Sequence, residues 1–201
     1  MLQKVKTKPD ISVDSKAHKQ IKENNEDHTT SWIHNVEDRF KDKSKEYIKE
    51  TLEKEAFPFA ILCEQWVNDF NIASAMRNAN AFNAKEIFYI GMKKIDRRGI
   101  TGAYNYKEIK WLSSIEDVLA LKNTYKFVAI DNLEGSVPLQ SYKWEPNTLM
   151  IFGSEGVGIT DYMRSLCDDM VYIPQYGSVR SLNAAVASGI VMNDFVSKFK
   201  L

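Results

Sequence analysis

The chain has 201 residues, enough for one α/β domain with an extension, and 44% of them are apolar, enough for a buried core. Its formal net charge is zero, so overall charge favours no particular partner, and any nucleic-acid site must come from local clustering. The longest strongly apolar stretch, residues 184–192, is far too short to span a bilayer, which needs about 20 residues. The N-terminus has no apolar run typical of a signal peptide, so we expect a cytoplasmic protein with no membrane partner.

Residues 1–55 are predicted to form a polar, partly mobile N-terminal extension. Residues 1–31 are highly charged and contain no Phe, Tyr or Trp, so they cannot bury enough apolar surface to offset the entropy lost on ordering. From Trp32 the apolar spacing becomes helical, and Ser44 is a candidate N-cap for a second helix.

After Pro58, short apolar strands alternate with helices. The predicted strands are 59–63, 86–90, 109–112, 127–130, 149–152 and 170–173, and the predicted helices are 72–83, 115–121, 159–166 and 182–199. This alternation predicts that residues 56–201 form an α/β domain with a mostly parallel sheet and helices on both faces.

The first of three unusual segments is the predicted helix that follows Asn71. We expect Asn71 to cap this helix, whose apolar residues from Ile72 to Phe82 recur at helical spacing. Arg77 lies off that apolar stripe and can project outward. An ordinary amphipathic helix with a solvated arginine would also explain this pattern.

The second segment follows the predicted strand 149–152 and is rich in glycine. Gly153, Gly156 and Gly158 surround Glu155, and glycines allow positive φ angles and close approach of the backbone to a ligand. The spacing fits neither a Walker loop nor a dinucleotide-binding fingerprint, so it predicts no phosphate cradle. A tight turn with a capping acid remains the simpler alternative.

The third segment runs from Ile173 into the last predicted helix. Ser181 and Asn183 open that helix, and its middle, residues 184–192, is small or apolar on nearly every face. Such a helix must be covered on all sides, and a partner subunit could supply part of the cover.

Together the three segments resemble, in order, the motifs of the SpoU (TrmH-like) branch of the SPOUT RNA methyltransferases. The first motif is matched by Asn71, Arg77, Ala79 and Phe82, the second by Gly153, Glu155 and Gly158, and the third by Ile173, Pro174, Gly177, Ser181, Leu182 and Asn183. The resemblance covers about residues 57–201.

The resemblance implies an α/β fold whose C-terminal part forms a trefoil knot, a homodimer, and S-adenosylmethionine as cofactor. By position, the residues implied to bind the cofactor are Ile130, Gly153, Ile173, Ser181 and Leu182. We see no cluster of metal ligands and expect no metal.

The implied reaction is methyl transfer to a ribose 2′-hydroxyl of tRNA or rRNA. Arg77 holds the catalytic position in the family, either as the base or as a cation that stabilises the developing alkoxide. Asn71, Glu155, Ser181 and Asn183 are the further candidate catalytic residues, which would orient Arg77, ribose and cofactor. Many rRNA members of this family carry a globular α/β RNA-binding domain before the catalytic domain. The short, polar and helical front segment of this chain is more similar to the tRNA members, so the resemblance favours tRNA.

A basic stretch, residues 92–110, is the candidate RNA surface. It holds six basic and two acidic residues, with Tyr104 and Tyr106 between them, which suits phosphate contacts and base stacking. The candidate RNA-binding residues are Lys93, Lys94, Arg97, Arg98 and Lys107, and Lys110 belongs to the same stretch. A solvated loop is the alternative.

Two other functions stay open. A related enzyme of the same fold could methylate a base, although Ser-Leu-Asn together with Arg77 points to ribose. A non-catalytic RNA-binding or assembly module is the second, although it would more readily have lost Arg77 or Asn183.

Overall fold

The structure is a computed structural model that describes residues 36–66, 69–91, 100 and 102–200. The chain divides into two compact units, residues 1–42 and 43–201. The described part of the first unit contains the short 3-10 helix η2 (Asp38–Phe40), and the helix predicted from Trp32 lies largely outside the described residues. The larger unit includes residues 43–55, while the domain boundary expected at residue 56 stays a prediction.

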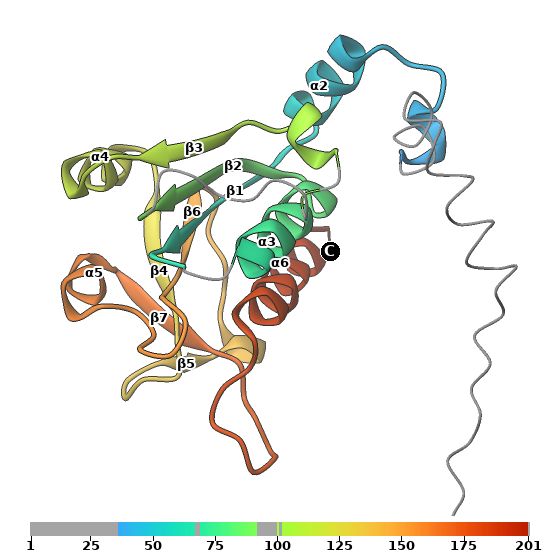
Figure 1. Ribbon diagram of the computed structural model, residues 1–201. Coiled ribbons are helices and arrows are strands. Elements are labelled where there is room, and N and C mark those ends of the chain that lie inside the picture. The colour runs from blue at the N-terminus through green and yellow to red at the C-terminus, as the bar shows by residue number, and fades with distance from the viewer. Residues whose placement is uncertain (1–35, 67–68, 92–99, 101, 201) are drawn as a thin grey trace, which may run out of the picture. The chain divides into compact units, whose positions relative to one another are not determined.

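The second unit is built on a parallel sheet with, among the described residues, seven strands in the order β3-β2-β1-β6-β4-β7-β5 (Figure 1). The strands are β1 (Phe57–Glu64), β2 (Ala84–Ile90), β3 (Ile109–Leu112), β4 (Lys126–Ile130), β5 (Val137–Pro138), β6 (Thr148–Phe152) and β7 (Asp169–Tyr172). The predicted α/β class with a parallel sheet is therefore confirmed.

Helices join the strands. The α-helices are α2 (Lys45–Lys54), α3 (Asp69–Ala81), α4 (Ile115–Ala120), α5 (Asp161–Leu166) and α6 (Ala184–Lys200), and the 3-10 helices are η4 (Ala103–Asn105), η5 (Leu121–Asn123) and η6 (Leu139–Ser141). Within the described ranges, none of the helices combines the length and apolarity needed to cross a membrane.

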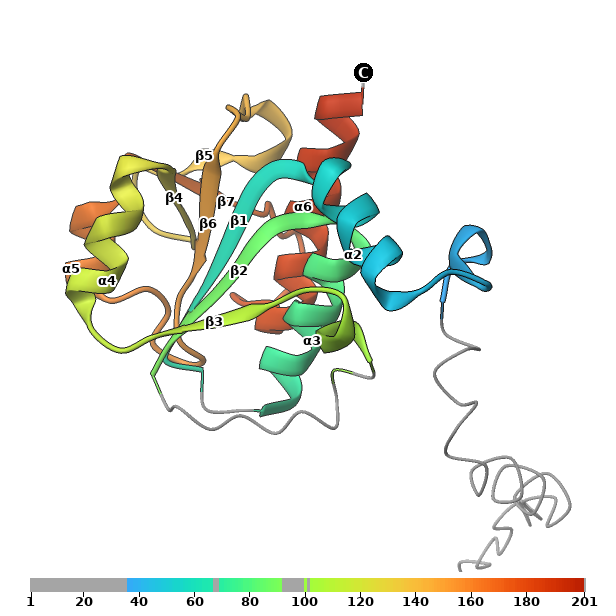
Figure 2. The same cartoon turned by 90° about the horizontal axis from the view of Figure 1, so that it is seen from above.

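The sheet is covered on both faces, as predicted. Figures 1 and 2 show α3 and α6 side by side on one face and α4 and α5 on the other. Alternate residues of β1 serve the two sides, because Phe59 and Ile61 join the core beneath α3 and α6, whereas Ala60 and Leu62 join the core beneath α4 and α5. All four of these side chains are fully buried, which explains why the strand reads as a continuous apolar run.

Polar caps fix where the helices begin. The Ser44 hydroxyl accepts a hydrogen bond from the Tyr47 amide at 3.1 Å, so the predicted cap of α2 is confirmed. Thr160 caps α5 in the same way through the Met163 amide. Because Thr160 holds the cap position, α5 begins at Asp161 rather than at Ile159, where apolar spacing had placed its start.

Two helix starts differ from the prediction in ways that matter for function. Helix α3 begins at Asp69, so Asn71 lies inside its first turn and is not its cap. The apolar stripe begins only at Ile72, and Phe70 before it is exposed, so periodicity could not locate the true start. Helix α6 begins at Ala184 rather than at Leu182, because Asn183 is its cap.

Candidate active site

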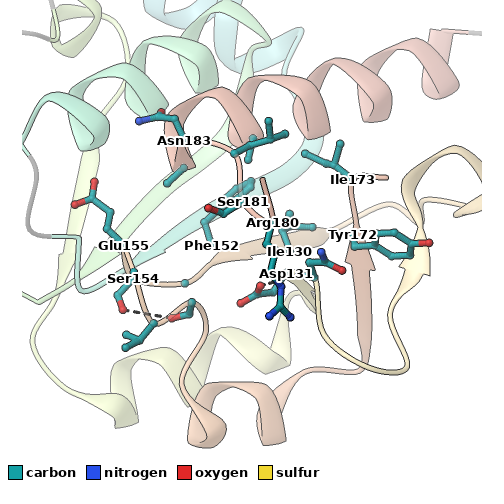
Figure 3. A pocket seen from close by; sticks show the side chains of 18 of the residues that line it. Ile130, Asp131, Phe152, Ser154, Glu155, Tyr172, Ile173, Arg180, Ser181 and Asn183 are labelled. Carbon is teal, nitrogen blue, oxygen red and sulfur yellow. Dashed lines mark hydrogen bonds between the residues drawn. The ribbon is translucent and has the colours of Figure 1, made fainter. Parts of the chain in front are cut away.

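A cavity of about 420 Å³ lies at the carboxyl ends of β4, β6 and β7, beside the N-terminus of α6 (Figure 3). This is the edge of a parallel sheet at which ligands bind, and the volume is in the range of small-molecule sites. Four stretches of chain line the cavity, 130–133, 152–158, 172–175 and 180–187, and Asn71 of α3 joins them.

The cavity gathers most of the residues that the sequence singled out. All five candidate cofactor-binding residues line it: Ile130, Gly153, Ile173, Ser181 and Leu182. Four of the five candidate catalytic residues do so as well: Asn71, Glu155, Ser181 and Asn183. Segments more than 100 residues apart in the chain thus meet in one place.

The walls of the cavity differ in chemistry. Ile130 and Phe152 are buried at the strand ends and supply an apolar wall. Asp131, Glu155 and Arg180 supply charged groups, which Figure 3 shows around the same cavity. A ligand with a flat apolar part and a charged part would match both kinds of wall.

The glycine-rich loop after β6 is packed against itself. A Cβ on Gly153 would lie 2.0 Å from the Ile159 amide nitrogen and 2.2 Å from the Gly158 carbonyl carbon. The Gly153 carbonyl also accepts a 2.8 Å hydrogen bond from the Trp66 indole. The chain's own backbone therefore requires glycine here. The close approach of a ligand to this glycine, which the sequence suggested, stays a prediction.

The carboxylate of Asp131 holds the far end of this loop. Its Oδ2 accepts a hydrogen bond from the Ile159 amide at 2.8 Å, and a Cβ on Gly158 would lie 2.4 Å from the same oxygen. Gly158 has φ of +76°, a conformation that strongly favours glycine. These contacts restrict the backbone conformation of the loop between Gly153, at the end of β6, and Thr160, the cap of α5.

A chain of side-chain hydrogen bonds links the three sequence motifs. Asn183 donates through Nδ2 to Oδ1 of Asn71 at 3.0 Å, and Asn71 donates through its own Nδ2 to Glu155. The Oδ1 of Asn183 accepts from the backbone amides of Ala185 and Val186 and so caps α6. The helix cap therefore fixes the orientation of the Asn183 amide, which in turn orients Asn71 and Glu155.

Arg77, the fifth candidate catalytic residue, stands apart. It is exposed on α3, off the buried stripe as predicted, and it is not among the residues that line the cavity. Arg77 lies six positions after Asn71 in α3, and at about 100° per residue this places the two side chains roughly 120° apart around the helix axis. One copy of the chain therefore does not bring Arg77 to the cavity.

The candidate RNA surface is described only in part. Lys93, Lys94, Arg97 and Arg98 lie outside the described residues. Lys107 is only 9% exposed, and burial lowers the pKa of its ammonium group, so it is poorly placed for phosphate contacts and we remove it from the proposed surface. Lys110 forms a 2.6 Å ion pair with Glu86, which raises the pKa of the lysine.

Sequence reasoning missed two charged residues of the cavity, Asp131 and Arg180. A usable signal for Asp131 was its place directly after the predicted strand 127–130, where ligand-binding side chains gather in parallel sheets. Arg180 directly precedes Ser181, but nothing in its spacing marks it. The part of the chain that the structure describes holds no group of three or more potential metal-ligating side chains.

Comparison with known proteins identifies the family. The model of the SpoU rRNA methylase family matches residues 58–193 of this chain. The chain belongs to the SpoU rRNA methylase family. The resemblance drawn from the three motifs is thereby confirmed.

Two curated SpoU relatives and a solved structure show the range of similarity. A tRNA (guanosine(18)-2′-O)-methyltransferase of Aquifex aeolicus is 26% identical over 157 residues, covering 75% of this chain and 74% of its own length. A putative TrmH family tRNA/rRNA methyltransferase of Bacillus subtilis is 26% identical over 161 residues, which cover 73% of this chain and 61% of its own length. The SpoU methyltransferase AviRb of Streptomyces viridochromogenes, solved with AdoMet, matches with a TM-score of 0.65 and 25% identity, over 72% of this chain and 59% of that chain.

As a member of the SpoU rRNA methylase family, the chain is an RNA methyltransferase. The matched AviRb structure was solved with AdoMet, that is, S-adenosylmethionine, as its cofactor. The cavity suits this cofactor, because an apolar wall can cover the adenine ring while charged side chains face a zwitterionic amino-acid end. Its volume is also sufficient for a molecule of this size.

Proposed function

We propose that this protein transfers a methyl group from S-adenosylmethionine to a ribose 2′-hydroxyl of tRNA. The observation that carries the proposal is that Asn71, Glu155, Ser181 and Asn183 line the same cavity as all the candidate cofactor-binding residues. The activity for which the Aquifex relative is named, 2′-O-methylation of a tRNA guanosine, supports both the reaction and the substrate.

The cofactor supplies a methyl group that is already activated, so the protein's work is to position the reactants and handle one proton. Ile130, Gly153, Ile173, Ser181 and Leu182 would hold the cofactor. The hydrogen-bonded Asn183–Asn71–Glu155 chain presents oriented polar groups at the same cavity, where they can fix the ribose.

Arg77 completes the proposed site from a second subunit. Arg77 is exposed and is not among the residues that line the cavity of its own chain, so we propose a homodimer in which Arg77 of the partner subunit reaches the ribose. There it grips a phosphate or stabilises the alkoxide as the hydroxyl loses its proton.

Helix α6 offers the surface for such a dimer. Its inner side is buried at Val191, Met192 and Phe195, whereas Val186 and Ile190 are 53% and 39% exposed. The chain itself therefore covers one side of this apolar helix. We assign the other side, where Val186 and Ile190 are exposed, to the partner subunit.

Replacement of Arg77 tests the mechanism. Arg77→Ala should reduce methyl transfer by a factor on the order of 100 to 1,000, as for loss of an oxyanion donor, while affinity for S-adenosylmethionine stays unchanged. Arg77→Lys should restore little of the methyl-transfer activity, because a lysine ammonium group cannot form the two parallel hydrogen bonds that a planar guanidinium forms. Arg164→Ala, on α5 outside the cavity, is the matched control and should keep full activity.

The assay is transfer of labelled methyl groups to tRNA and, in parallel, to rRNA, followed by mass spectrometry of nucleosides. 2′-O-methylated nucleosides from tRNA are the expected product. A base-methylated product would refute the reaction, rRNA as the sole substrate would refute the tRNA assignment, and undiminished activity of Arg77→Ala would refute the mechanism.

A further inference from the structure

Two of the charged residues that line the cavity have no part in the reaction proposed above. Three charged side chains line the cavity, the carboxylates of Asp131 and Glu155 and the guanidinium of Arg180. Glu155 is engaged by Asn71 in the chain of hydrogen bonds described above. Asp131 and Arg180 lie outside that chain.

Arg180 is the single basic residue among those that line the cavity. Its backbone carbonyl accepts a hydrogen bond from Nε2 of Gln175, which ties the loop before α6 together. Within the described ranges, the guanidinium itself forms no ion pair with any carboxylate. When a ligand fills the cavity and displaces water, a guanidinium at its wall is favoured only if an anion accompanies it.

Asp131 presents the opposite charge from the end of β4. Its Oδ1 accepts a hydrogen bond from the Asn132 amide at 2.7 Å and its Oδ2 accepts one from Ile159 at 2.8 Å. A carboxylate has about four acceptor sites, so about half of its capacity remains for a ligand. Figure 3 shows Asp131 and Arg180 at the same part of the cavity, reached from two different loops.

We propose that Arg180 and Asp131 together bind the amino-acid end of S-adenosylmethionine, Arg180 its carboxylate and Asp131 its ammonium group. The amino-acid end is a zwitterion with one group of each sign, and the cavity offers the Arg180 guanidinium and the remaining acceptor sites of the Asp131 carboxylate. The two side chains therefore act as a pair of charges that fixes the cofactor's flexible tail. This inference rests on the use of S-adenosylmethionine by the proposed enzyme.

The alternative ligand for Arg180 is an RNA phosphate at the mouth of the cavity. Cofactor binding measured without RNA separates the two, because an arginine that only grips RNA leaves the affinity for the cofactor unchanged. Both variants below replace partly or fully exposed side chains, so folding is checked simply by their melting temperatures.

The experiment is isothermal calorimetry on the full chain with three ligands. S-adenosylmethionine carries both charged groups, decarboxylated S-adenosylmethionine lacks the carboxylate, and 5′-methylthioadenosine lacks the whole amino-acid end. Arg180→Gln should weaken binding of S-adenosylmethionine about 10- to 100-fold, as for loss of a hydrogen bond between charged groups, and leave the other two ligands within about twofold. Arg164→Gln is the matched control and should change none of the three.

Asp131→Asn keeps the shape of the side chain and one acceptor for the Ile159 amide. It should weaken both ligands that carry the ammonium group and leave 5′-methylthioadenosine unchanged. Equal weakening of all three ligands would show that Asp131 acts only through the loop and would overturn its assigned role.

Unchanged affinity of Arg180→Gln for S-adenosylmethionine, with or without weaker RNA binding, would overturn the role of Arg180. These failures leave the proposed function standing. In contrast, a wild-type protein that binds no S-adenosylmethionine would refute the proposed function and this inference with it.

Discussion

At the scale of single residues, the candidate site depends on side-chain contacts between distant parts of the chain. Asn71, Glu155 and Asn183 were singled out because they match family motifs, and the structure shows them hydrogen-bonded to one another across 112 positions of chain. Such a contact cannot be derived from spacing, since it depends on how the strands are ordered. The contact of Asp131 with Ile159 is of the same kind, because the two residues are distant in sequence, although the place of Asp131 directly after a predicted strand was a usable signal.

The glycines of the cavity provide a test at this scale. Gly153→Ala should destabilise the protein by about 3 kcal/mol or more, because its Cβ would overlap the Gly158–Ile159 backbone, which cannot rotate away as a side chain can. Gly177→Ala, in the loop before α6, should change stability by less than about 0.5 kcal/mol, since no atom lies within 4 Å of the added Cβ. Urea denaturation of both variants measures the difference. Equal stabilities would contradict the packing of the loop described here.

At the scale of elements, strands were predicted better than helix starts. Strand β3 was predicted with its observed bounds. Strands β4 and β6 were each one residue longer than predicted, and they could be located because buried strands of a parallel sheet are continuous apolar runs. Helices α3, α5 and α6 began two or three residues away from the prediction, because their starts depend on caps and exposed first turns that apolar periodicity does not report. The two-residue strand β5 was too short to leave any pattern.

Asn183 both caps α6 and donates a hydrogen bond to Asn71, and two substitutions can separate these roles. Asn183→Asp keeps an acceptor for the Ala185 and Val186 amides but loses the donor to Asn71, so stability should stay near that of the wild type while methyl transfer falls. Asn183→Ala loses both contacts, so its free energy of unfolding should also fall, by about 1 kcal/mol. Denaturation curves and methyl-transfer rates of the two variants are to be compared. Full activity of Asn183→Asp would show that the bond to Asn71 is not needed for turnover.

At the scale of the whole molecule, sequence alternation predicted the fold class but could not order the strands. The order β3-β2-β1-β6-β4-β7-β5 places β6 beside β1, although about 80 residues separate them in the chain, and this adjacency brings the glycine-rich loop to the first motif. The trefoil knot implied by the resemblance remains a prediction. So does the dimer, although the apolar side of α6 gives it a defined surface.

The dimer is tested by making that surface charged. Val186→Lys and Ile190→Lys both alter exposed positions of α6, so neither should unfold the chain, but together they should oppose association by placing like charges at a twofold interface. Light scattering should report about twice 23.1 kDa for the wild type and about 23.1 kDa for the double variant. Gln140→Lys, at an exposed position outside α6, is the control and should remain dimeric. A wild-type monomer at micromolar concentration would contradict the proposal.

A site shared between subunits makes a further demand, because two inactive variants should then complement each other. Arg77→Ala damages what a subunit gives to its partner, whereas Glu155→Ala damages the cavity of the subunit itself. A mixed dimer of the two has one site with both defects and one site with none. After random reassembly about half of the dimers are mixed, so the mixture should regain about a quarter of the wild-type activity. If Arg77 instead served the cavity of its own chain, every site in the mixed dimer would carry one defect, and the mixture would stay as inactive as its components.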